Sequence, residues 1–473
     1  MKCLVSIFFL ILSVYTAAGQ NGNEWIKYQQ PYFKIPVAKD GIYKITQDAL
    51  RQAGLPNSAD PKTFQLFHRG IEQSILVAGE NDGVFNTTDH IEFYGRANDG
   101  TLDASLYEIH DHQPHKYYNL YSDTTAYFLT FGGTASAKRI TSYSGDSGGL
   151  AEETHHLAEK LLVLKESYSP GMDYGSIQKT TFDVGEGWTG LQILQGQERS
   201  YTIEQISETS PVSGKPVLEV LLTGRGPMLH DVELYAGSRF LATVSFPAYE
   251  SFKHVQEIEW TDIDATGKLV IRIRVTGASG ADRVSAGYIR LQFPQTFNIM
   301  GAPQKTFFLN PNPSDNSLLK ILNPSVGLRL FDVTDPTSVL QIAGQLTTTL
   351  DAVVPSTSMQ RKILATSESI PAAGIRKVTF REINPAGHNY IFITHRLLRK
   401  PAMGYIDPVK AFAEYRALPE GGGFDTLIMN IDQLYDQFNY GEASPRAVYQ
   451  FMKFFASVKL PDYLFLVGKG LDV

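Results

Sequence analysis

Cysteine is almost absent from this chain of 473 residues, which contains one, Cys3. Cys3 lies inside an apolar stretch at the N-terminus that we expect to be removed on export. The remaining chain would then have no thiol, which excludes a disulfide, a thiolate metal site and a thiolate nucleophile. Ordinary hydrophobic cores must hold the fold, and a chain of this length can supply several.

Long apolar runs are also scarce. The longest, residues 3–15, follows the positive Lys2 and is too short for a permanent anchor across a bilayer of about 30 Å. Small residues of the kind that a signal peptidase accepts come next (TAAG), so we predict a signal peptide over residues 1–19 with cleavage before Gln20. A lipidated cysteine should follow such a run, whereas Cys3 precedes it. We expect a mature protein without a transmembrane anchor, soluble or peripherally attached.

A long basic run is the third absence. The chain has 42 Lys and Arg against 49 Asp and Glu, a formal net charge of −7. This balance argues against nucleic acid as a partner and against an electrostatic membrane tether. What the chain has instead is 40 Gly, 24 Pro, 24 Tyr and 27 Phe, which is typical of β-rich modules with many turns.

Residues 20–140 are predicted to form an N-terminal β-rich domain. Alternating apolar residues over 33–37 and 41–45, on either side of a Lys-Asp-Gly turn, predict a β-hairpin. A short helix is expected over 47–53, ended by a Gly and a Pro. Further strands are expected at 64–67, 74–78, 90–94 and 126–131, the last (AYFLTF) fully buried.

A β-sandwich domain is predicted over 141–296, followed by a small β-rich module over 297–384. Residues 268–275 (KLVIRIRV) alternate cleanly, which predicts one buried and one wet face. Other strands of an antiparallel sandwich are expected at 217–222, 231–235, 241–246 and 286–293. The small module, with strands at 327–333 and 377–380, could be a separate unit or the closing strands of its neighbour.

The pattern changes in residues 385–473, where strands alternate with helices. Apolar strands with little alternation are expected at 390–394, 426–430 and 463–467. Asp407-Pro408 and Ser444-Pro445 are N-cap and first-turn pairs that start helices. The second helix carries an apolar stripe made of Val448, Phe451, Met452 and Phe455. This order predicts a parallel sheet with crossover helices, and the fold class is therefore all-β modules followed by an α/β domain.

Three parallel strands with two helices make half of a doubly wound domain. Six residues follow the third expected strand, whereas a further crossover needs a dozen or more. We expect bare sheet faces and an unpaired edge at this end, so that the α/β domain is incomplete.

Two parts of the sequence resemble known families. Residues 390–470, with YIFIT, AEYRAL, DQLYDQFNYGEASPRAVYQFMKFF and PDYLFLVGKG, resemble the opening of the gingipain-type cysteine peptidase domain, a caspase-like α/β fold. The N-terminal stretches YFKIPVAKDGIYKITQDAL, FQLFHRGIEQSILV and DGVFNTTDHIEFYGRANDG look like the front of type IX secretion system sortases, which are gingipain-like proteins of the Bacteroidetes surface. The resemblance is loose between residues 145 and 370.

The resemblance implies a cysteine-type endopeptidase that acts on exported proteins at the bacterial surface. In the sortases, cleavage removes a C-terminal sorting signal and joins the cargo to a surface lipopolysaccharide. It implies exported cargo and other secretion-system components at the outer membrane as partners, and no cofactor. The family's catalytic His and Cys lie beyond the LVGKG strand, so we assign no catalytic, cofactor-binding or metal residue in this chain. His388 and His395 flank the first strand, and many members have an acidic residue at the position of Lys469.

Three polar clusters have residue types that can bind ligands. His110-Asp111-His112-Gln113-Pro114-His115 could chelate zinc or copper, but an exposed polar loop accounts for it better. Residues 80–89 have oxygen ligands around a glycine but miss the EF-hand spacing, and Asx-turns at Asp82 and Asn86 explain them. His155-His156 beside Glu152 and Glu153 reads as a solvated helix or loop face rather than a metal site.

Two glycine-containing segments are further candidate sites. Gly468-Lys469-Gly470 lacks the residues of a phosphate-binding loop. Gly185-Glu186-Gly187-Trp188 favours a turn with a packed Trp over a sugar platform.

Two other functions stay open on the sequence. The chain could be a non-catalytic binding or scaffolding protein of the cell envelope, built of β-sandwiches with a remnant α/β end. It could also be a secreted carbohydrate-binding or glycan-active protein, which rests on aromatic content and sandwich architecture alone.

Overall fold

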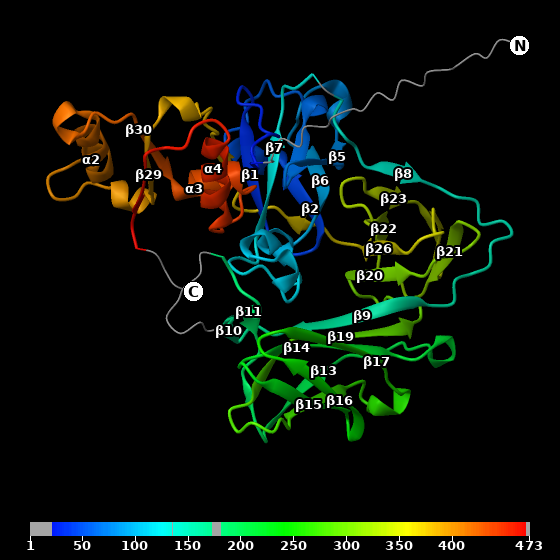
Figure 1. Ribbon diagram of the computed structural model, residues 1–473. Coiled ribbons are helices and arrows are strands. Elements are labelled where there is room, and N and C mark those ends of the chain that lie inside the picture. The colour runs from blue at the N-terminus through cyan, green and yellow to red at the C-terminus, as the bar shows by residue number, and fades with distance from the viewer. Residues whose placement is uncertain (1–20, 135, 173–180, 470–473) are drawn as a thin grey trace, which may run out of the picture.

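The computed structural model describes residues 21–134, 136–172 and 181–469. Several β-sheet units and one α/β unit follow one another along the chain (Figure 1). The N-terminal sheets stand beside the α/β unit on one side and the middle sheets on the other, with a large sandwich below. The predicted signal peptide, residues 1–19, lies outside the described residues.

The N-terminal unit is a sandwich of two sheets. One has the order β28-β1-β7-β3-β4 and the other β27-β2-β6-β5. Their strands are β1 (Tyr32–Val37), β2 (Gly41–Thr46), β3 (Gln65–His68), β4 (Ile71–Gln73), β5 (Ile75–Ala78), β6 (His90–Gly95), β7 (Thr125–Thr130), β27 (Ile370–Pro371) and β28 (Arg376–Val378). A core including Phe33, Ile35, Phe64 and Phe93 fills the space between the sheets. The predicted helix is α1 (Gln47–Gln52), capped by Thr46.

The predicted hairpin of residues 33–37 and 41–45 is wrong. Both strands form, but β1 pairs with β7 and β28 in one sheet, and β2 pairs with β6 and β27 in the other. The alternation correctly predicted which face of each strand is buried, and the buried faces of the two strands point into the same core. It could not tell that the short turn crosses from one sheet to the facing one.

The second unit is a larger antiparallel sandwich, which confirms the architecture expected there. Four strands of a ten-stranded sheet, β17-β14-β19-β9, face a four-stranded sheet, β13-β18-β15-β16. The strands are β9 (His156–Val163), β13 (Glu198–Ile203), β14 (Val217–Gly224), β15 (Leu229–Ala236), β16 (Arg239–Pro247), β17 (Ser251–Glu257), β18 (Leu269–Val275) and β19 (Arg283–Gln295). In β18 every second residue is fully buried, as the alternation predicted. The hairpin β10 (Ser167–Pro170) and β11 (Glu186–Thr189) and the short β12 (Ile193–Leu194) complete it.

The third unit continues the ten-stranded sheet from β9 through β20-β26-β22-β23-β8, with a three-stranded sheet β21-β25-β24 on its core. The strands are β8 (Thr141–Tyr143), β20 (Gln304–Leu309), β21 (Asn316–Ile321), β22 (Arg329–Asp332), β23 (Leu340–Ile342), β24 (Gly344–Leu346), β25 (Leu350–Pro355) and β26 (Arg361–Thr366). Strand pairing crosses the predicted domain limits. β8 pairs with β23 here, whereas β27 and β28 join the N-terminal sandwich.

The α/β unit has a parallel sheet of order β30-β29-β31, which confirms the predicted parallel pattern. Its elements are β29 (Tyr390–Thr394), α2 (Pro408–Ala417), β30 (Thr426–Asn430), α3 (Ile431–Phe438), α4 (Arg446–Ala456) and β31 (Tyr463–Val467). Helices α3 and α4 cover one face of the sheet and α2 the other. Helix α3 was not predicted, because its eight residues lie in a polar stretch.

The third strand, β31, forms as predicted and has the bare face and the unpaired edge expected at this end of the sheet. The exposed fractions of Tyr463, Leu464, Phe465 and Leu466 lie between 39% and 60%. Within the described residues β31 pairs with β29 alone, and a strand with one neighbour keeps a row of unpaired backbone groups. The unit therefore combines well-covered β29 and β30 with an open apolar edge.

Candidate active-site edge of the α/β unit

The carboxyl ends of the three parallel strands meet at one edge of the sheet. From β29 the chain passes through α2 to β30 on one side, and then through α3 and α4 to β31 on the other side of β29. The strand order therefore reverses between β29 and β31. In open α/β sheets, ligands bind outside the carboxyl ends of the strands at such a switch point. We take this edge as the candidate active site.

Local signals in the sequence fix the helices that hold this edge. Asp407 caps α2 by accepting a hydrogen bond from the Lys410 amide at 3.0 Å, and Pro408 occupies the first turn. Ser444 accepts from the Arg446 amide at 3.2 Å at the start of α4. Phe451 and Phe455 of the predicted stripe are fully buried against the sheet. These are the caps and the apolar face that the sequence predicted.

The residues at the edge are few and mostly uncharged. Thr394, the last residue of β29, is 2% exposed. His395 follows it and is exposed, and its Nδ1 accepts from the Leu397 amide at 3.3 Å, which caps the turn η8 (Arg396–Arg399). Lys469 is exposed after β31. His388 precedes β29, so the structure does not bring His388 and His395 together. No hydrolytic pair forms from these described residues.

A hollow of about 350 Å³ lies on the β30 side of the sheet. Its cations already have partners: Arg399 pairs with Asp407, and Lys410 with Glu414. Arg381 donates to the backbone oxygen of Ile428 at 2.8 Å. Because Arg399 and Lys410 are paired with carboxylates and Arg381 is bound to a backbone oxygen, we assign no ligand to the hollow.

One polar cluster beside the α/β unit was not foreseen from the sequence. It joins the N-terminal sandwich to the turn between α3 and α4, residues 439–445. Arg69 donates from Nε to Glu442 Oε1 at 2.8 Å and from Nη2 to Oε2 at 3.2 Å, and also pairs with Asp99 at 2.8 Å. Although burial alone lowers the pKa of Arg69, Glu442 and Asp99 raise it overall. Thr125 donates to the same Glu442 oxygen at 2.8 Å.

A second set of contacts is centred on Asp436 of α3. Lys34 of β1 donates to Asp436 and to the backbone oxygen of Gly441, both at 2.6 Å. Arg376 of β28 binds the other Asp436 oxygen at 2.8 Å. The carboxylates of Asp436 and Glu442 are 8% and 1% exposed, so each belongs to a desolvated ion pair. Lys34 lies 402 residues from Asp436 and Arg69 lies 373 residues from Glu442, which is why no local pattern predicts these pairs.

The histidine cluster at 110–115 separates into two environments. The exposed His110 and its neighbour His112 form the turn η4 (His110–His112), as expected of a polar loop. His115 instead turns inward against Tyr288, with ring centroids 5.6 Å apart, and burial lowers its pKa to about 4. The three rings therefore do not converge as metal ligands would.

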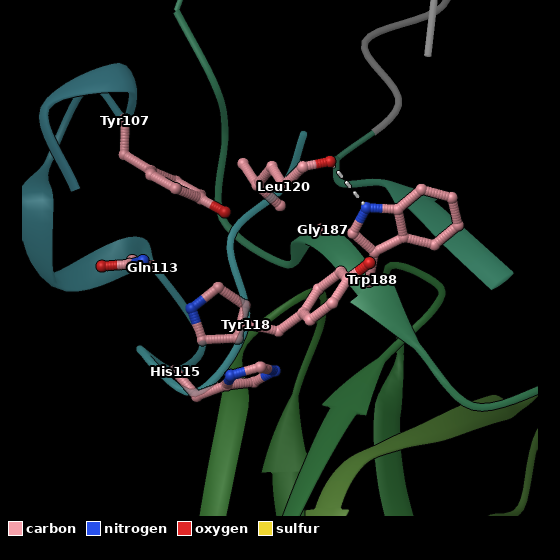
Figure 2. A pocket seen from close by; sticks show the side chains of 8 residues that line it. Tyr107, Gln113, His115, Tyr118, Leu120, Gly187 and Trp188 are labelled. Atoms are coloured by element: carbon pink, nitrogen blue, oxygen red, sulfur yellow. Dashed lines mark hydrogen bonds between the residues drawn. The ribbon is translucent and has the colours of Figure 1, made fainter. Parts of the chain in front are cut away.

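His115 lines a small cavity where the N-terminal unit meets β11 (Figure 2). Trp188 donates from its indole to the Leu120 backbone oxygen at 2.9 Å, and Tyr107 donates to the Glu186 oxygen at 2.8 Å. The space is about 10 Å³, room for a single water. The packed role predicted for Trp188 is confirmed, because the ring belongs to a joint between units.

The acidic loop at 80–89 is held by protein groups. Glu80 forms a bidentate pair with Arg139, with distances of 2.7 to 3.1 Å. Asp82 accepts from the Val84 amide at 2.9 Å, which confirms the Asx-turn predicted there. Asn86 acts differently, because its side chain donates to Asp82 at 2.9 Å. The oxygens of the loop are thus used internally.

The prediction that His155 and His156 lie on a solvated face is wrong for His156. That residue starts β9, is 0% exposed, and lies against Phe297 and Phe307 with ring centroids 5.3 and 4.8 Å away. Glu153 is engaged by Asn312 and Ser317, and Glu152 by Lys320. Within the described ranges, no three His, Cys, Asp or Glu side chains are grouped to hold a metal ion.

Burial of His156 predicts an acid sensitivity. Burial lowers its pKa to about 3, so between pH 6.5 and 3 the unfolded chain holds a proton that the folded chain does not. Stability should therefore fall as pH drops below 6.5. Between pH 7 and pH 5 the free energy of unfolding of a His156→Leu variant should fall by about 2 kcal/mol less than that of the parent protein. Urea unfolding at both pH values measures this. His110→Leu, at an exposed position, is the control, and equal pH dependence of all three proteins would contradict the assignment.

The chain is similar to known proteins both in its α/β unit and over most of its length. Residues 383–473 match the model of peptidase family C25. The chain resembles the crystal structure of dimeric latent PorU from Porphyromonas gingivalis, with 15% identity and a TM-score of 0.60 over 91% of this chain and 40% of that one. The chain thus spans less than half of that protein's length. At this identity the likeness establishes the fold, namely β-sandwiches followed by the start of a caspase-like α/β domain.

Carbohydrate-binding modules match a smaller part. The CBM36-1 domain of a multidomain xylanase from the hindgut metagenome of Trinervitermes trinervoides has 18% identity and a TM-score of 0.19, over 28% of this chain and 96% of its own. A CBM36 in complex with calcium and xylotriose has 16% identity and the same TM-score, over 28% and 98%. Scores this low carry no argument about sugar binding.

None of the curated proteins matches the chain. In the described part of the chain, no helix combines the length and apolarity needed to cross a membrane.

Proposed function

We propose that this chain, whose residues 383–473 match peptidase family C25, is the N-terminal part of a gingipain-like cysteine peptidase and, more specifically, of a type IX secretion system sortase. Such an enzyme cleaves peptide bonds with a thiolate activated by an imidazole, because an unassisted thiol is mostly protonated at neutral pH. The catalytic His and Cys would come from sequence beyond β31. The proposed substrates are exported proteins at the bacterial surface.

One observation carries the proposal. The residues that match the peptidase family are the ones that fold into the sheet β30-β29-β31, with its switch point between β29 and β31. The exposed apolar side chains of β31, including Phe465 and Leu466, suit a strand that receives another strand on its free edge. Catalytic groups that follow β31 would then reach the carboxyl edge near Thr394.

The β-sandwiches would bind exported cargo or other secretion-system components at the outer membrane. Their size supports this role, since three separate cores build a broad surface ahead of the peptidase unit. A non-catalytic scaffolding protein of the cell envelope would use the same surface. Catalytic residues encoded downstream separate the two functions.

Chain 20–473, expressed alone, should show no thiol-dependent peptidase activity. Cys3 is the one cysteine and precedes residue 20, so no thiolate is present to attack a peptide bond. The measurement is cleavage of a mixed fluorogenic peptide library with and without iodoacetamide. Hydrolysis that iodoacetamide abolishes would contradict this expectation.

The proposal itself is tested on the coding DNA beyond codon 473. In the gingipain-type family the catalytic His lies in a Gly-His-Gly strand end, so a continuing or frameshifted frame that encodes this motif and then a Cys supports a peptidase. A stop codon at this position, together with stable folding of the expressed chain, supports the scaffold and overturns the peptidase proposal.

A further inference from the structure

We infer that the N-terminal sandwich is a permanent clamp on the α/β unit rather than a removable propeptide, so that a cut in the connecting segment 379–389 leaves one two-piece particle. This inference goes beyond the proposed function, because it concerns what holds the two units together and not what either one does. Three features of the structure carry it.

The first feature is where the N-terminal sandwich ends in the chain. β27 pairs with β2, and β28 pairs with β1, so each of the two sheets gains an edge strand from residues 370–378. The front unit is therefore complete at Val378. A cut after this point removes no strand from it, whereas a cut before Ile370 would remove one strand from each sheet.

The second feature is direct packing between the units. The outer face of the sheet with β1 and β7 lies against the α3–α4 side of the α/β unit (Figure 1). All six residues of β7 are buried, although the sandwich core covers only one face of that strand. Gly441, with φ +85°, approaches so closely that a Cβ there would lie 2.5 Å from that of Ala126. A removable contact would leave this strand face bare.

The third feature is the set of buried charges. Glu442 is 1% exposed and receives bonds from Arg69 and Thr125, both on the sandwich. Asp436 is 8% exposed and is paired with Lys34 and Arg376. Separation of the units would leave the two carboxylates without these cations. Charges paired and desolvated in this way favour slow dissociation.

The clamp also leaves the candidate active-site edge free. Among the described residues, the hydrogen bonds and ion pairs between the sandwich and the α/β unit fall on α3, on residues 439–445 and on Arg446. Thr394, His395 and Lys469 at the carboxyl edge take no part in them. An inhibitory propeptide would have to cover that edge, and this sandwich does not.

The test is a controlled cut in the exported chain. A recognition sequence for a site-specific protease is inserted between Ala386 and Gly387, which are exposed in the turn η7 (Pro385–Gly387). After complete cleavage, the two pieces should elute together in gel filtration at the position of the uncut chain. Elution as two separate pieces would overturn the inference, and would leave the peptidase proposal untouched.

Charge reversal identifies the contact responsible. Lys34→Glu places a carboxylate beside Asp436 and should weaken association of the cut pieces at least about tenfold. Lys62→Glu makes the same charge change at an exposed position of the same sandwich and should have no effect. Thermal unfolding of the isolated front piece checks that Lys34→Glu still folds. Equal association of the two variants would contradict the clamp.

Discussion

Glu442→Ala is expected to destabilise the α/β unit by about 3 kcal/mol, because it removes one partner of a buried ion pair and leaves the other behind. The substitution removes the two hydrogen bonds that Arg69 donates to Glu442 and the one that Thr125 donates. Arg69 keeps Asp99, but that carboxylate is 37% exposed and cannot replace the buried one. The measurement is urea unfolding followed by hydrogen exchange of α3 and α4.

The matched control for Glu442 is Glu414→Ala on α2. Glu414 is 63% exposed, and its pair with Lys410 spans one helical turn at the surface. Such pairs contribute at most about 1 kcal/mol. Losses of similar size in the two variants would show that Glu442 does not link the units.

Asp282→Ala is expected to destabilise the large sandwich by about 3 kcal/mol. Asp282 and His230 are both fully buried, with Nδ1 and Oδ1 2.5 Å apart. The other ring nitrogen of His230 lies 2.6 Å from the backbone oxygen of Ala248. The alanine variant leaves the fully buried Nδ1 without its carboxylate partner. Thermal unfolding of chain 20–473 measures the loss.

The geometry around Asp282 supports this expectation and supplies a second variant. A Cβ on Gly277 would lie 1.9 Å from Asp282 Oδ2, so Gly277→Ala should push the carboxylate out of place and destabilise the sandwich too. Glu257→Ala, on the exposed side of β17, should change stability by less than about 0.5 kcal/mol. The account fails if Asp282→Ala is as mild as Glu257→Ala.

The α/β unit could be predicted closely because its signals are local. Asp407, Pro408 and the Phe451–Phe455 spacing each act within one or two helical turns. The clean alternation in β18 likewise predicts one buried face from adjacent residues. Strand and helix assignments of this kind depend on side chains that are neighbours in the sequence, and the structure confirms them.

The failures lie where long-range contacts decide. β1 and β2 were paired with each other because a short turn joins them, whereas their true partners are strands up to about 350 residues away. His156 sits in a polar stretch, yet Phe297 and Phe307 enclose it.

The clamp residues show the same limit. Lys34 is one polar residue in an alternating strand, and nothing near it in the sequence points to Asp436. The family resemblance marked the segment that contains Asp436 and Glu442 but assigned no role to either. The structure supplies that role by placing both beside the N-terminal sandwich.

The most direct test of the central claim is mass spectrometry of the protein purified from the cells that make it. The account predicts peptides that continue past Val473, among them a Gly-His-Gly sequence and a cysteine that an iodoacetamide probe labels. A native product that ends at residue 473 and remains folded would contradict it.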